Sequence, residues 1–294
     1  MDWKTKEKII KYILLIFAMS SIMFLIGIVI VLFREGLPIF YKIGIIDFLF
    51  GQEWYPTYDP ASFGILPLIS ASVLVTLGAM IFAVPIGLST SVFISYIMPK
   101  SIKNFIKPII ELLAGIPSVI YGLFGMKILG PFLKDIFGLP TGLTALTASI
   151  MLGIMALPTI ISLSEDAITS VPKKFRDASL ALGGTRWETI SKVILPTASS
   201  GIVTSIMLGM GRAMGETMTV LMVAGGASAM PEGILKPVRP MTATIAAEMG
   251  ETPVGSNHYQ ALFGIAIVLF IITLSFNIIA DLTRKRFYKK VSGK

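Results

Sequence analysis

The chain has 294 residues, of which 54% are hydrophobic and 14% charged, and its formal net charge is +8. Soluble domains carry about 25% charged residues, so this composition excludes an ordinary soluble protein. The sequence has no cysteine and a single histidine, which excludes disulfides, thiol chemistry, the common zinc sites and a Ser-His-Asp triad. A G-x4-G-K-[ST] phosphate-binding loop is also missing. We therefore expect this chain to have no catalytic residue and no metal site, and we do not expect it to be an enzyme.

Apolar stretches predict six membrane spans, because a helix needs about 20 residues to cross a hydrocarbon core of about 30 Å. The spans are expected at residues 12–33, 68–98, 108–129, 143–163, 198–223 and 260–280. Residues 1–63 hold the first span, expected to remain as an uncleaved anchor, and an outer loop. Residues 64–283 form the remaining membrane domain, whose largest inner loop is 164–195, and residues 284–294 form a basic tail.

The distribution of Lys and Arg predicts the orientation. With the N-terminus inside, 18 of the 25 Lys and Arg residues lie on the inner side, 6 lie on the outer side and Arg212 lies within a span. Positive charge is enriched in cytoplasmic loops, so both termini are expected in the cytoplasm and the protein in the plasma membrane. Contact with anionic lipid and this topology explain the net charge, so no nucleic-acid partner is expected.

Two segments early in the chain leave their roles open. The outer segment 34–63 contains Trp54, Tyr55, Pro56 and Tyr58, which fit either an interfacial aromatic belt or a protein contact. In the third span, Glu111 lies near the inner surface among Lys103 and Lys107. It either pairs with a cation as part of an inner gate or sits in the headgroup region.

Pro117 and Pro158 are expected to kink the third and fourth spans.

A sequence pattern in the inner loop 164–195 indicates that this loop forms a docking surface. It contains Asp177-Ala178-Ser179-Leu180-Ala181-Leu182-Gly183 and, after nine more residues, Val193-Ile194-Leu195-Pro196. This resembles the pattern E-A-A-x3-G-x9-I-x-L-P of permease subunits of ABC importers. A helix is expected over 173–182, ended by Gly183-Gly184, and a second over 185–193 with Trp187, Ile190 and Ile194 at helical spacing. That apolar stripe alone would also fit a helix lying on the membrane surface. The resemblance implies ATPase contacts at Asp177, Ala178, Ser179, Ala181, Gly183, Trp187 and Glu188.

The fifth span carries two charges, Arg212 and Glu216, followed by Thr217. Charges inside a membrane are costly and usually mark a transport path. A guanidinium group offers a planar fork of donors that matches a tetrahedral oxyanion. The alternative is an intrahelical ion pair between the two residues, which are one turn apart. Gly201, Ser205 and Gly209 recur every fourth residue, as do Gly211 and Gly215, which favours close helix packing.

The outer segment 225–258 contains a short helical pattern at 241–249 that would lie across the outer mouth as a plug or docking ledge. His258, at its end, is expected to be a solvated loop residue.

Several further blocks resemble the phosphate-uptake permeases, and the PstC type more than its paralogue PstA. They are Gly64-Ile65-Leu66-Pro67-Leu68-Ile69, Glu111 to Gly122, Gly211 to Met218, Ala224-Gly225-Gly226 and Ala247 to Thr252. The resemblance implies the six-span, MetI-like fold of type I ABC importers. It implies a PstA-like second permease, a homodimeric cytoplasmic ATPase that binds ATP and Mg, and an external phosphate-binding protein. A permease for sulfate or molybdate, or a secondary anion transporter, remains an alternative.

Overall fold

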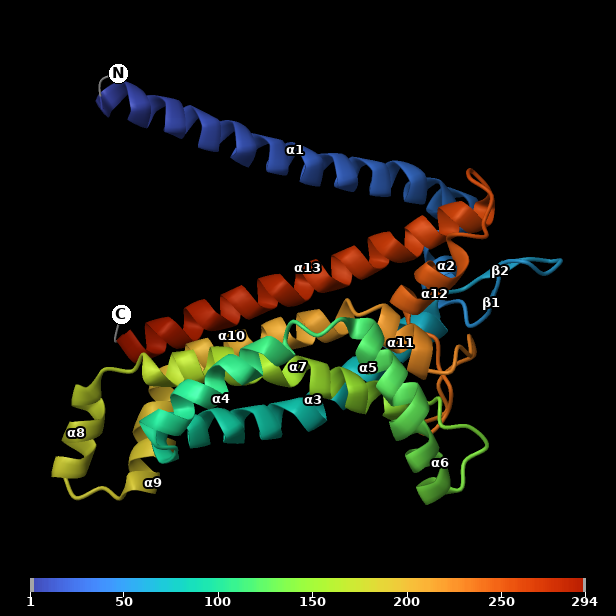
Figure 1. Ribbon diagram of the computed structural model, residues 1–294. Helices are drawn as coiled ribbons and strands as arrows, with labels where there is room; N and C mark the ends of the chain where they lie inside the picture. Colours follow the sequence, from blue (N-terminus) through green and yellow to red (C-terminus); the bar gives the residue numbers. More distant parts are fainter. Residues whose placement is uncertain (1–2, 293–294) are drawn as a thin grey trace.

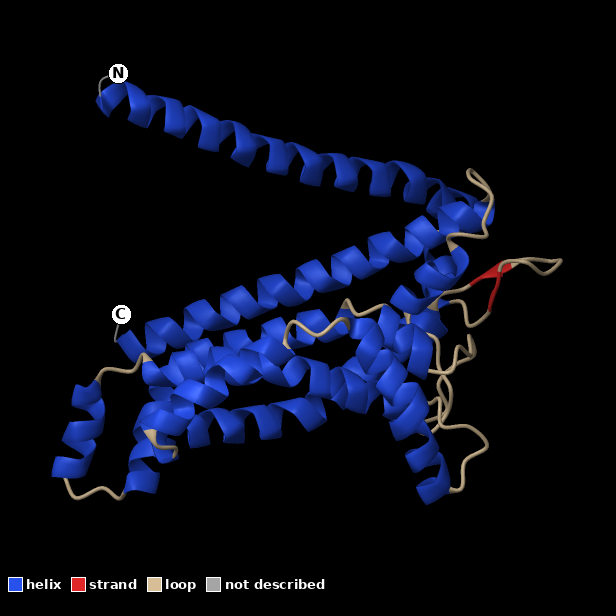
Figure 2. Ribbon diagram, in the orientation of Figure 1, coloured by secondary structure: helices blue, strands red, loops and turns tan. Residues whose placement is uncertain are grey.

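The computed structural model describes residues 3–292, which are mainly helical (Figures 1 and 2). The α-helices are α1 (Trp3–Ile43), α2 (Ile45–Phe50), α3 (Leu66–Val92), α4 (Lys100–Leu113), α5 (Ser118–Phe124), α6 (Gly130–Phe137), α7 (Ala145–Thr169), α8 (Lys173–Ala181), α9 (Arg186–Glu188), α10 (Leu195–Met214), α11 (Met218–Val223), α12 (Met241–Glu248) and α13 (Asn257–Ser292). Three π-helical turns adjoin them: η1 (Phe93–Ile97), η2 (Gly125–Leu129) and η3 (Thr189–Ile194). Two short strands, β1 (Trp54–Tyr55) and β2 (Ser62–Phe63), pair antiparallel.

The predicted six spans are confirmed when one bent pair of helices counts as a single span. Five helical stretches are long and apolar enough to cross a membrane, namely Glu7–Ile43, Leu66–Ile97, Ala145–Thr169, Arg186–Met214 and Asn257–Ile279. The sixth combines Lys100–Leu113 with Ser118–Phe137, which meet at a bend of 88°. Pro117 has extended backbone at this break and directly precedes α5. Proline lacks an N–H and disfavours helix in the residue before it, which explains the break. Pro85 and Pro158 instead lie inside helices that stay continuous.

The two ends of the chain lie at the same end of the molecule. The first turns of α1 and the last turns of α13 lie at the end of the molecule that also holds α8 and α9, with α1 well separated from those two helices, whereas the strand pair and α12 lie at the opposite end (Figure 1). We call these the inner and outer ends, following the distribution of basic residues. Residues 284–292 of the expected basic tail continue α13, and residues 293–294 lie outside the described residues.

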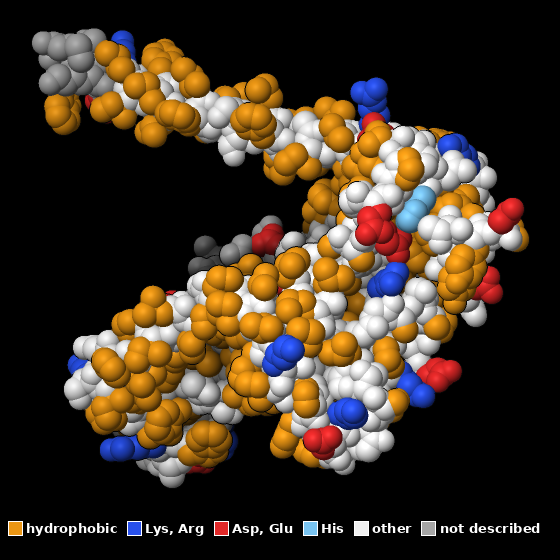
Figure 3. All heavy atoms as spheres, turned by 45° about the vertical axis from the view of Figure 1, so that its right-hand side comes forward, with side chains coloured by type: hydrophobic (Ala, Val, Ile, Leu, Met, Phe, Trp, Pro, Cys, Tyr) orange, Lys and Arg blue, Asp and Glu red, His pale blue; other side chains and the backbone are white. Residues whose placement is uncertain are grey.

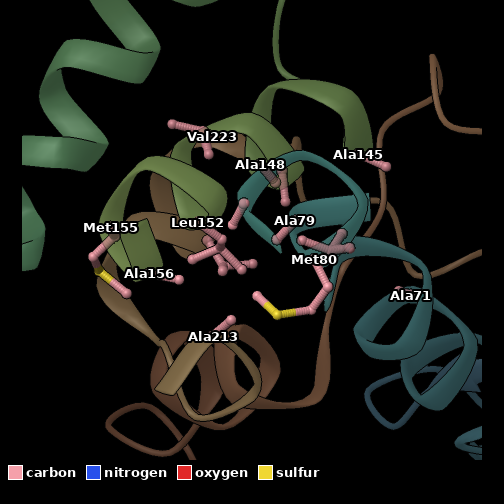
Figure 4. Packing of buried hydrophobic residues seen from close by; sticks show 14 of the residues in the cluster. Ala71, Ala79, Met80, Ala145, Ala148, Leu152, Met155, Ala156, Ala213 and Val223 are labelled. Carbon is pink, nitrogen blue, oxygen red and sulfur yellow. The ribbon is translucent and has the colours of Figure 1, made fainter. Parts of the chain in front are cut away.

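The main core lies between α3, α7, α10 and α11, where many of the buried side chains are alanine (Figure 4). Small side chains allow the helices to approach closely. Gly153 of α7 is one such contact, because a Cβ there would lie 2.8 Å from Cδ1 of Phe82 and 3.1 Å from the carbonyl oxygen of Ala79 on α3. This bundle holds the positions of the residues discussed below.

The first helix joins the bundle only at its outer end. Ile39 of α1 is buried, and a Cβ at Gly36 would lie 2.9 Å from the carbonyl oxygen of Phe263 on α13. Toward the inner end α1 diverges from α13 (Figure 1), and hydrophobic side chains cover its surface (Figure 3). An 18-residue window of this span has none of its residues buried within the chain.

Trp54, in the outer segment 34–63, has neither of the two roles expected for it. Trp54 is only 2% exposed and belongs to a second buried cluster with Phe48, Ile65 and Leu262. It therefore supports the fold and is neither an interfacial belt residue nor a surface contact. Tyr55 and Tyr58 are exposed, which is compatible with either of the two expected roles.

Candidate functional site

Arg212 lies in the last turn of α10 and reaches the break in the third span. Its Nη2 donates to the carbonyl oxygen of Ala114 at 2.9 Å, and its Nη1 donates to Oγ1 of Thr159 at 3.2 Å. Ala114 is the residue that caps the end of α4. Carbonyl groups at a helix end have no partner within the helix and carry partial negative charge, so a cation there is stabilised. Three separate spans thus meet at this guanidinium.

The guanidinium has donors left over, and the residue before it in the chain, Gly211, has open space around it. Arginine carries five N–H donors, and the described residues accept only from Nη1 and Nη2 of Arg212, both from neutral oxygens. Among the side chains that the structure describes, none forms an ion pair with Arg212. A Cβ added at Gly211 would meet nothing within 4 Å. A half-buried cation with free donors can bind a small anion.

The alternative of an intrahelical ion pair between Arg212 and Glu216 is excluded by the structure. Helix α10 ends at Met214, so the two residues do not share a helix face. Oε1 of Glu216 accepts instead from the backbone N–H of Thr219 at 3.1 Å, within the first turn of α11. A carboxylate there satisfies a free N–H and complements the positive end of the helix. Each charge is therefore stabilised by a different helix end, and neither needs the other.

Thr217 and the carbonyl of Glu216 complete the break between α10 and α11. Thr217 precedes α11, and its Oγ1 donates weakly to the carbonyl oxygen of Gly215 at 3.4 Å. The carbonyl oxygen of Glu216 accepts from Oγ1 of Thr242 on α12 at 2.8 Å. The structure thus brings Arg212, Glu216 and Thr217 to one interrupted region, where α12 contacts it.

Glu111 does not pair with the lysines that surround it in the sequence. It is exposed on α4, and its Oε1 accepts from Oγ of Ser162 at 3.4 Å. Lys103 and Lys107 face α7 instead, where both bind the carboxylate of Glu165, with Nζ of Lys107 2.7 Å from Oε2. Lys107 also pairs with Asp166.

The sequence analysis did not identify Glu165 as a functional residue. It is 2% exposed and bridges two cations of α4. Residues 164–195 were expected to be a loop, whereas α7 continues to Thr169. The signal for this extension was Pro172, because a helix usually ends shortly before a proline. No residue of α4 is fully buried, and these ion pairs join it to α7.

The predicted helix of the inner loop is confirmed as α8, and Asp177, Ala178 and Ala181 are exposed along it. Gly183 follows with φ of +84°, a left-handed conformation that glycine adopts without strain. Thr185 and Glu188 then cap each other's backbone N–H groups, which starts α9. The Oγ of Ser179 and Oγ1 of Thr189 lie 2.9 Å apart and join the two segments.

The predicted apolar stripe of the second segment is split by the structure. Ile190 and Ile194 are buried against Val92 and Ile168, whereas Trp187 is 67% exposed. This stripe therefore packs into the bundle, and a helix lying on the membrane through these three residues is excluded. Between α8 and η3 lies a cavity of about 430 Å³, lined in part by Phe175, Ala178 and Leu182.

A polar cluster at the outer end also escaped the sequence analysis. Glu248, the last residue of α12, accepts from Nη1 of Arg239 at 2.6 Å and lies 2.8 Å from Nε2 of His258. Its two oxygens also accept from Nε1 of Trp54 at 3.2 and 3.1 Å. The histidine side chain is 16% exposed, so the expected solvated loop residue is wrong. Figure 3 shows acidic side chains beside the histidine.

Comparisons with known proteins identify the family to which this architecture belongs. Residues 83–293 match the family described as "Binding-protein-dependent transport system inner membrane component". The chain is 39% identical over 253 residues to the probable ABC transporter permease protein YqgH of Bacillus subtilis, covering 85% of this chain and 82% of that protein. It is 34% identical over 246 residues to the phosphate transport system permease protein PstC of Mesorhizobium japonicum, covering 77% and 74%. The identity to PstC 1 of Mycobacterium tuberculosis is 35% over 242 residues, covering 75% and 72%.

Solved structures share the fold. The bacterial alginate ABC transporter, in complex with its alginate-bound periplasmic protein, aligns with a TM-score of 0.68 and 16% identity over 98% of both chains. An inward-facing structure of the methionine transporter MetNI aligns with a TM-score of 0.60 and 19% identity over 76% of this chain and 95% of that chain. These likenesses confirm the MetI-like fold expected from the sequence. The chain belongs to the family of binding-protein-dependent transport system inner membrane components, which are the permease subunits of ABC importers.

Proposed function

We propose that this permease moves inorganic phosphate into the cytoplasm. The observation that supports this most directly is Arg212, a half-buried cation with unused donors beside the open space at Gly211. Relatives at 34% and 35% identity carry the name phosphate transport system permease protein PstC. A guanidinium fork suits a tetrahedral oxyanion, and the chain offers it where two spans are interrupted.

The pathway in this proposal contains Arg212, Glu216 and Thr217. Arg212 attracts the anion, whereas Glu216 and Thr217 hold the break between α10 and α11 open beside it. Glu111 is exposed on α4, three residues before the carbonyl that binds Arg212, and contributes to an inner gate. A negative charge there repels an anion that would return from the inner end.

The inner loop docks on the ATPase in this proposal. The contact residues are Asp177, Ala178, Ser179, Ala181, Gly183, Trp187 and Glu188, which lie on α8, on α9 and in the turn between them. The full transporter in the plasma membrane then contains a PstA-like second permease and a homodimeric cytoplasmic ATPase that binds ATP and Mg. An external protein delivers phosphate.

Sulfate and molybdate are the alternative substrates, because both are tetrahedral oxyanions that the same guanidinium fits. Membership of the importer family excludes the secondary anion transporter that the sequence alone left open. Competition separates the oxyanions. If the proposal holds, unlabelled phosphate suppresses uptake of radiolabelled phosphate, whereas equal concentrations of sulfate or molybdate do not.

The role of Arg212 is tested in proteoliposomes that contain the assembled transporter. Arg212→Gln keeps a similar side-chain volume and removes the charge, so uptake of radiolabelled phosphate per complex should fall at least about tenfold, because hydrogen bonds to charged groups contribute roughly 1.5–3 kcal/mol. Arg212→Lys should restore uptake only in part, since it lacks the fork. The double variant Arg212→Gln, Glu216→Gln should stay inactive. Recovery of uptake in that double variant would show that the two charges act only as a pair and would refute the substrate role.

A further inference from the structure

A small hairpin projects from the outer end of the molecule. Residues 54–63 form β1, β2 and the loop between them, which reaches beyond the outer ends of α1 and α13 (Figures 1 and 2). Near its tip the rings of Tyr55 and Tyr58 stack 5.0 Å apart at 10°, and Tyr58 is 65% exposed. Exposed tyrosines that are held in one arrangement lose little entropy on binding a partner.

The base of the hairpin is firmly attached to the fold. Trp54 is buried, contacts Phe63 edge-on at 6.2 Å and donates from its indole Nε1 to Glu248. Next to it the backbones of Gly51 and Gly64 touch, since a Cβ at Gly64 would lie 2.3 Å from the carbonyl carbon of Gly51. The base of the hairpin therefore cannot move far without shifting Glu248.

Glu248 connects this base to the interrupted region at Arg212. It ends α12, the same helix from which Thr242 donates to the carbonyl oxygen of Glu216 at 2.8 Å. At the start of α12, the backbone N–H of Met241 donates to Oγ of Ser72 on α3 at 2.9 Å. One helix of eight residues thus contacts the hairpin at one end and the break beside Arg212 at the other.

We propose that the hairpin tip is a docking surface for the external binding protein and that α12 transmits its arrival to the pathway. The inference rests on the proposed function for the partner's identity. Residues 54–63 with the adjoining Glu53 contain two acidic residues, Glu53 and Asp59, and no Lys or Arg. A partner surface with Lys or Arg around an apolar patch would complement both the carboxylates and the tyrosine faces.

A membrane surface fits the hairpin less well. Anionic headgroups would repel Glu53 and Asp59, both of which are exposed. Interfacial aromatic residues also lie at the level of the headgroups, whereas this tip extends past the outer ends of two spans (Figure 1). The observations therefore favour a protein over a lipid surface.

The test measures ATP hydrolysis by the complete transporter in nanodiscs, stimulated by increasing amounts of phosphate-loaded binding protein. Tyr58→Ala and Tyr55→Ala should each raise the binding-protein concentration for half-maximal stimulation about tenfold, with the maximal rate unchanged. Tyr41→Ala is the matched control, because Tyr41 is an 86% exposed tyrosine at the outer end of α1 and lies outside the hairpin. An unchanged half-maximal concentration in both hairpin variants would overturn the proposal.

A second measurement addresses transmission. Thr242→Val removes the bond to the carbonyl of Glu216 and should lower the maximal stimulated rate while leaving the half-maximal concentration unaltered. An unchanged maximal rate would refute transmission through α12 and leave docking standing. If the unaltered transporter itself fails to respond to phosphate-loaded binding protein, the proposed substrate is wrong, and this outcome is distinct from failure of the tyrosine variants alone.

The membrane alternative has its own outcome. In Tyr58→Trp, brominated lipids should quench no more tryptophan fluorescence than they do in the unaltered chain, and addition of binding protein should shift the emission to shorter wavelength. Added quenching by brominated lipid without that shift would assign the tip to the headgroup region and overturn docking on a protein.

Discussion

The small residues of α10 fall into two groups according to what lies beside them. A Cβ at Gly201 would lie 2.4 Å from Cβ of Ala167, and one at Gly209 would lie 2.7 Å from Cγ1 of Ile160. Between them Oγ of Ser205 is 2.5 Å from Oγ of Ser164. These three residues bring α10 against α7, whereas Gly211 faces open space. The same spacing in the sequence therefore serves packing in one half of the helix and leaves room in the other.

This division predicts opposite results for one substitution at two positions. Gly201→Leu should lower the thermal stability of the detergent-solubilised transporter, since overpacking a core costs about 1–3 kcal/mol. Gly211→Leu should leave stability unchanged and reduce phosphate uptake per assembled complex severalfold, because the side chain fills the space beside Arg212. Thermal unfolding and proteoliposome uptake, measured on both variants, check this. Normal uptake by Gly211→Leu would place the anion elsewhere.

At the scale of elements, α8 is presented to the inner side by features of its own. Gly183 turns the chain after the helix, and the mutual caps of Thr185 and Glu188 start the next segment. Ile190 and Ile194 then anchor that segment in the bundle. Before α8, Ile168 of α7 is buried in the same cluster, so the helix is anchored on both sides and is suited to transmit movement from a bound partner.

We expect the docking of α8 to depend on the size of one side chain. Ala178→Trp should abolish transport and transport-stimulated ATP hydrolysis, since the bulky ring prevents close approach of the ATPase. Ala178 is exposed, so the chain itself should fold normally. Gly183→Trp is a poorer choice, because its φ of +84° would strain any side chain.

Ala178→Ser is the matched control at the same position and should keep activity close to that of the unaltered chain. Copurification of the ATPase with each variant, together with ATP hydrolysis, provides the measurement. Efficient uptake by a stably assembled Ala178→Trp transporter would contradict docking through α8.

At the scale of the whole molecule, the fold divides charge between two ends. The last turns of α13 and the loop with α8 lie together at one end, and the loop with Lys236 lies near the other, as the charge distribution predicted (Figure 1). Positive charge is retained on the cytoplasmic side during insertion. The structure therefore groups at one end the segments that the charge count assigns to the inner side.

The orientation can be tested directly, because the chain has no cysteine. Single substitutions Lys173→Cys, Lys236→Cys and Lys290→Cys should react with a membrane-impermeant thiol reagent in intact cells only at position 236. After the membrane is opened, all three positions should be labelled. Labelling of position 173 in intact cells would reverse the orientation and remove the basis for ATPase docking.

The parts of the structure that the sequence predicted depend on local patterns. Long apolar runs located the spans, and the motif around Asp177 located α8. In the third span the sequence predicted only a kink at Pro117, whereas the structure has an 88° break, because residues 112–120 are mostly apolar and are compatible with one continuous helix. The ion pairs of Glu165 and the cluster around Glu248 join residues far apart in the chain, so no local pattern could indicate them.

The break in the third span also constrains how the chain enters the membrane. Helix α4 has 14 residues and rises only about 21 Å, too short to cross a core of about 30 Å. In lipid the carbonyl of Ala114 has no partner until Arg212 arrives, 98 residues later. Proteins are synthesised from the N-terminus, so residues 100–137 meet the translocon before their partner exists. The third span therefore gains this hydrogen bond only after the fifth span has been synthesised.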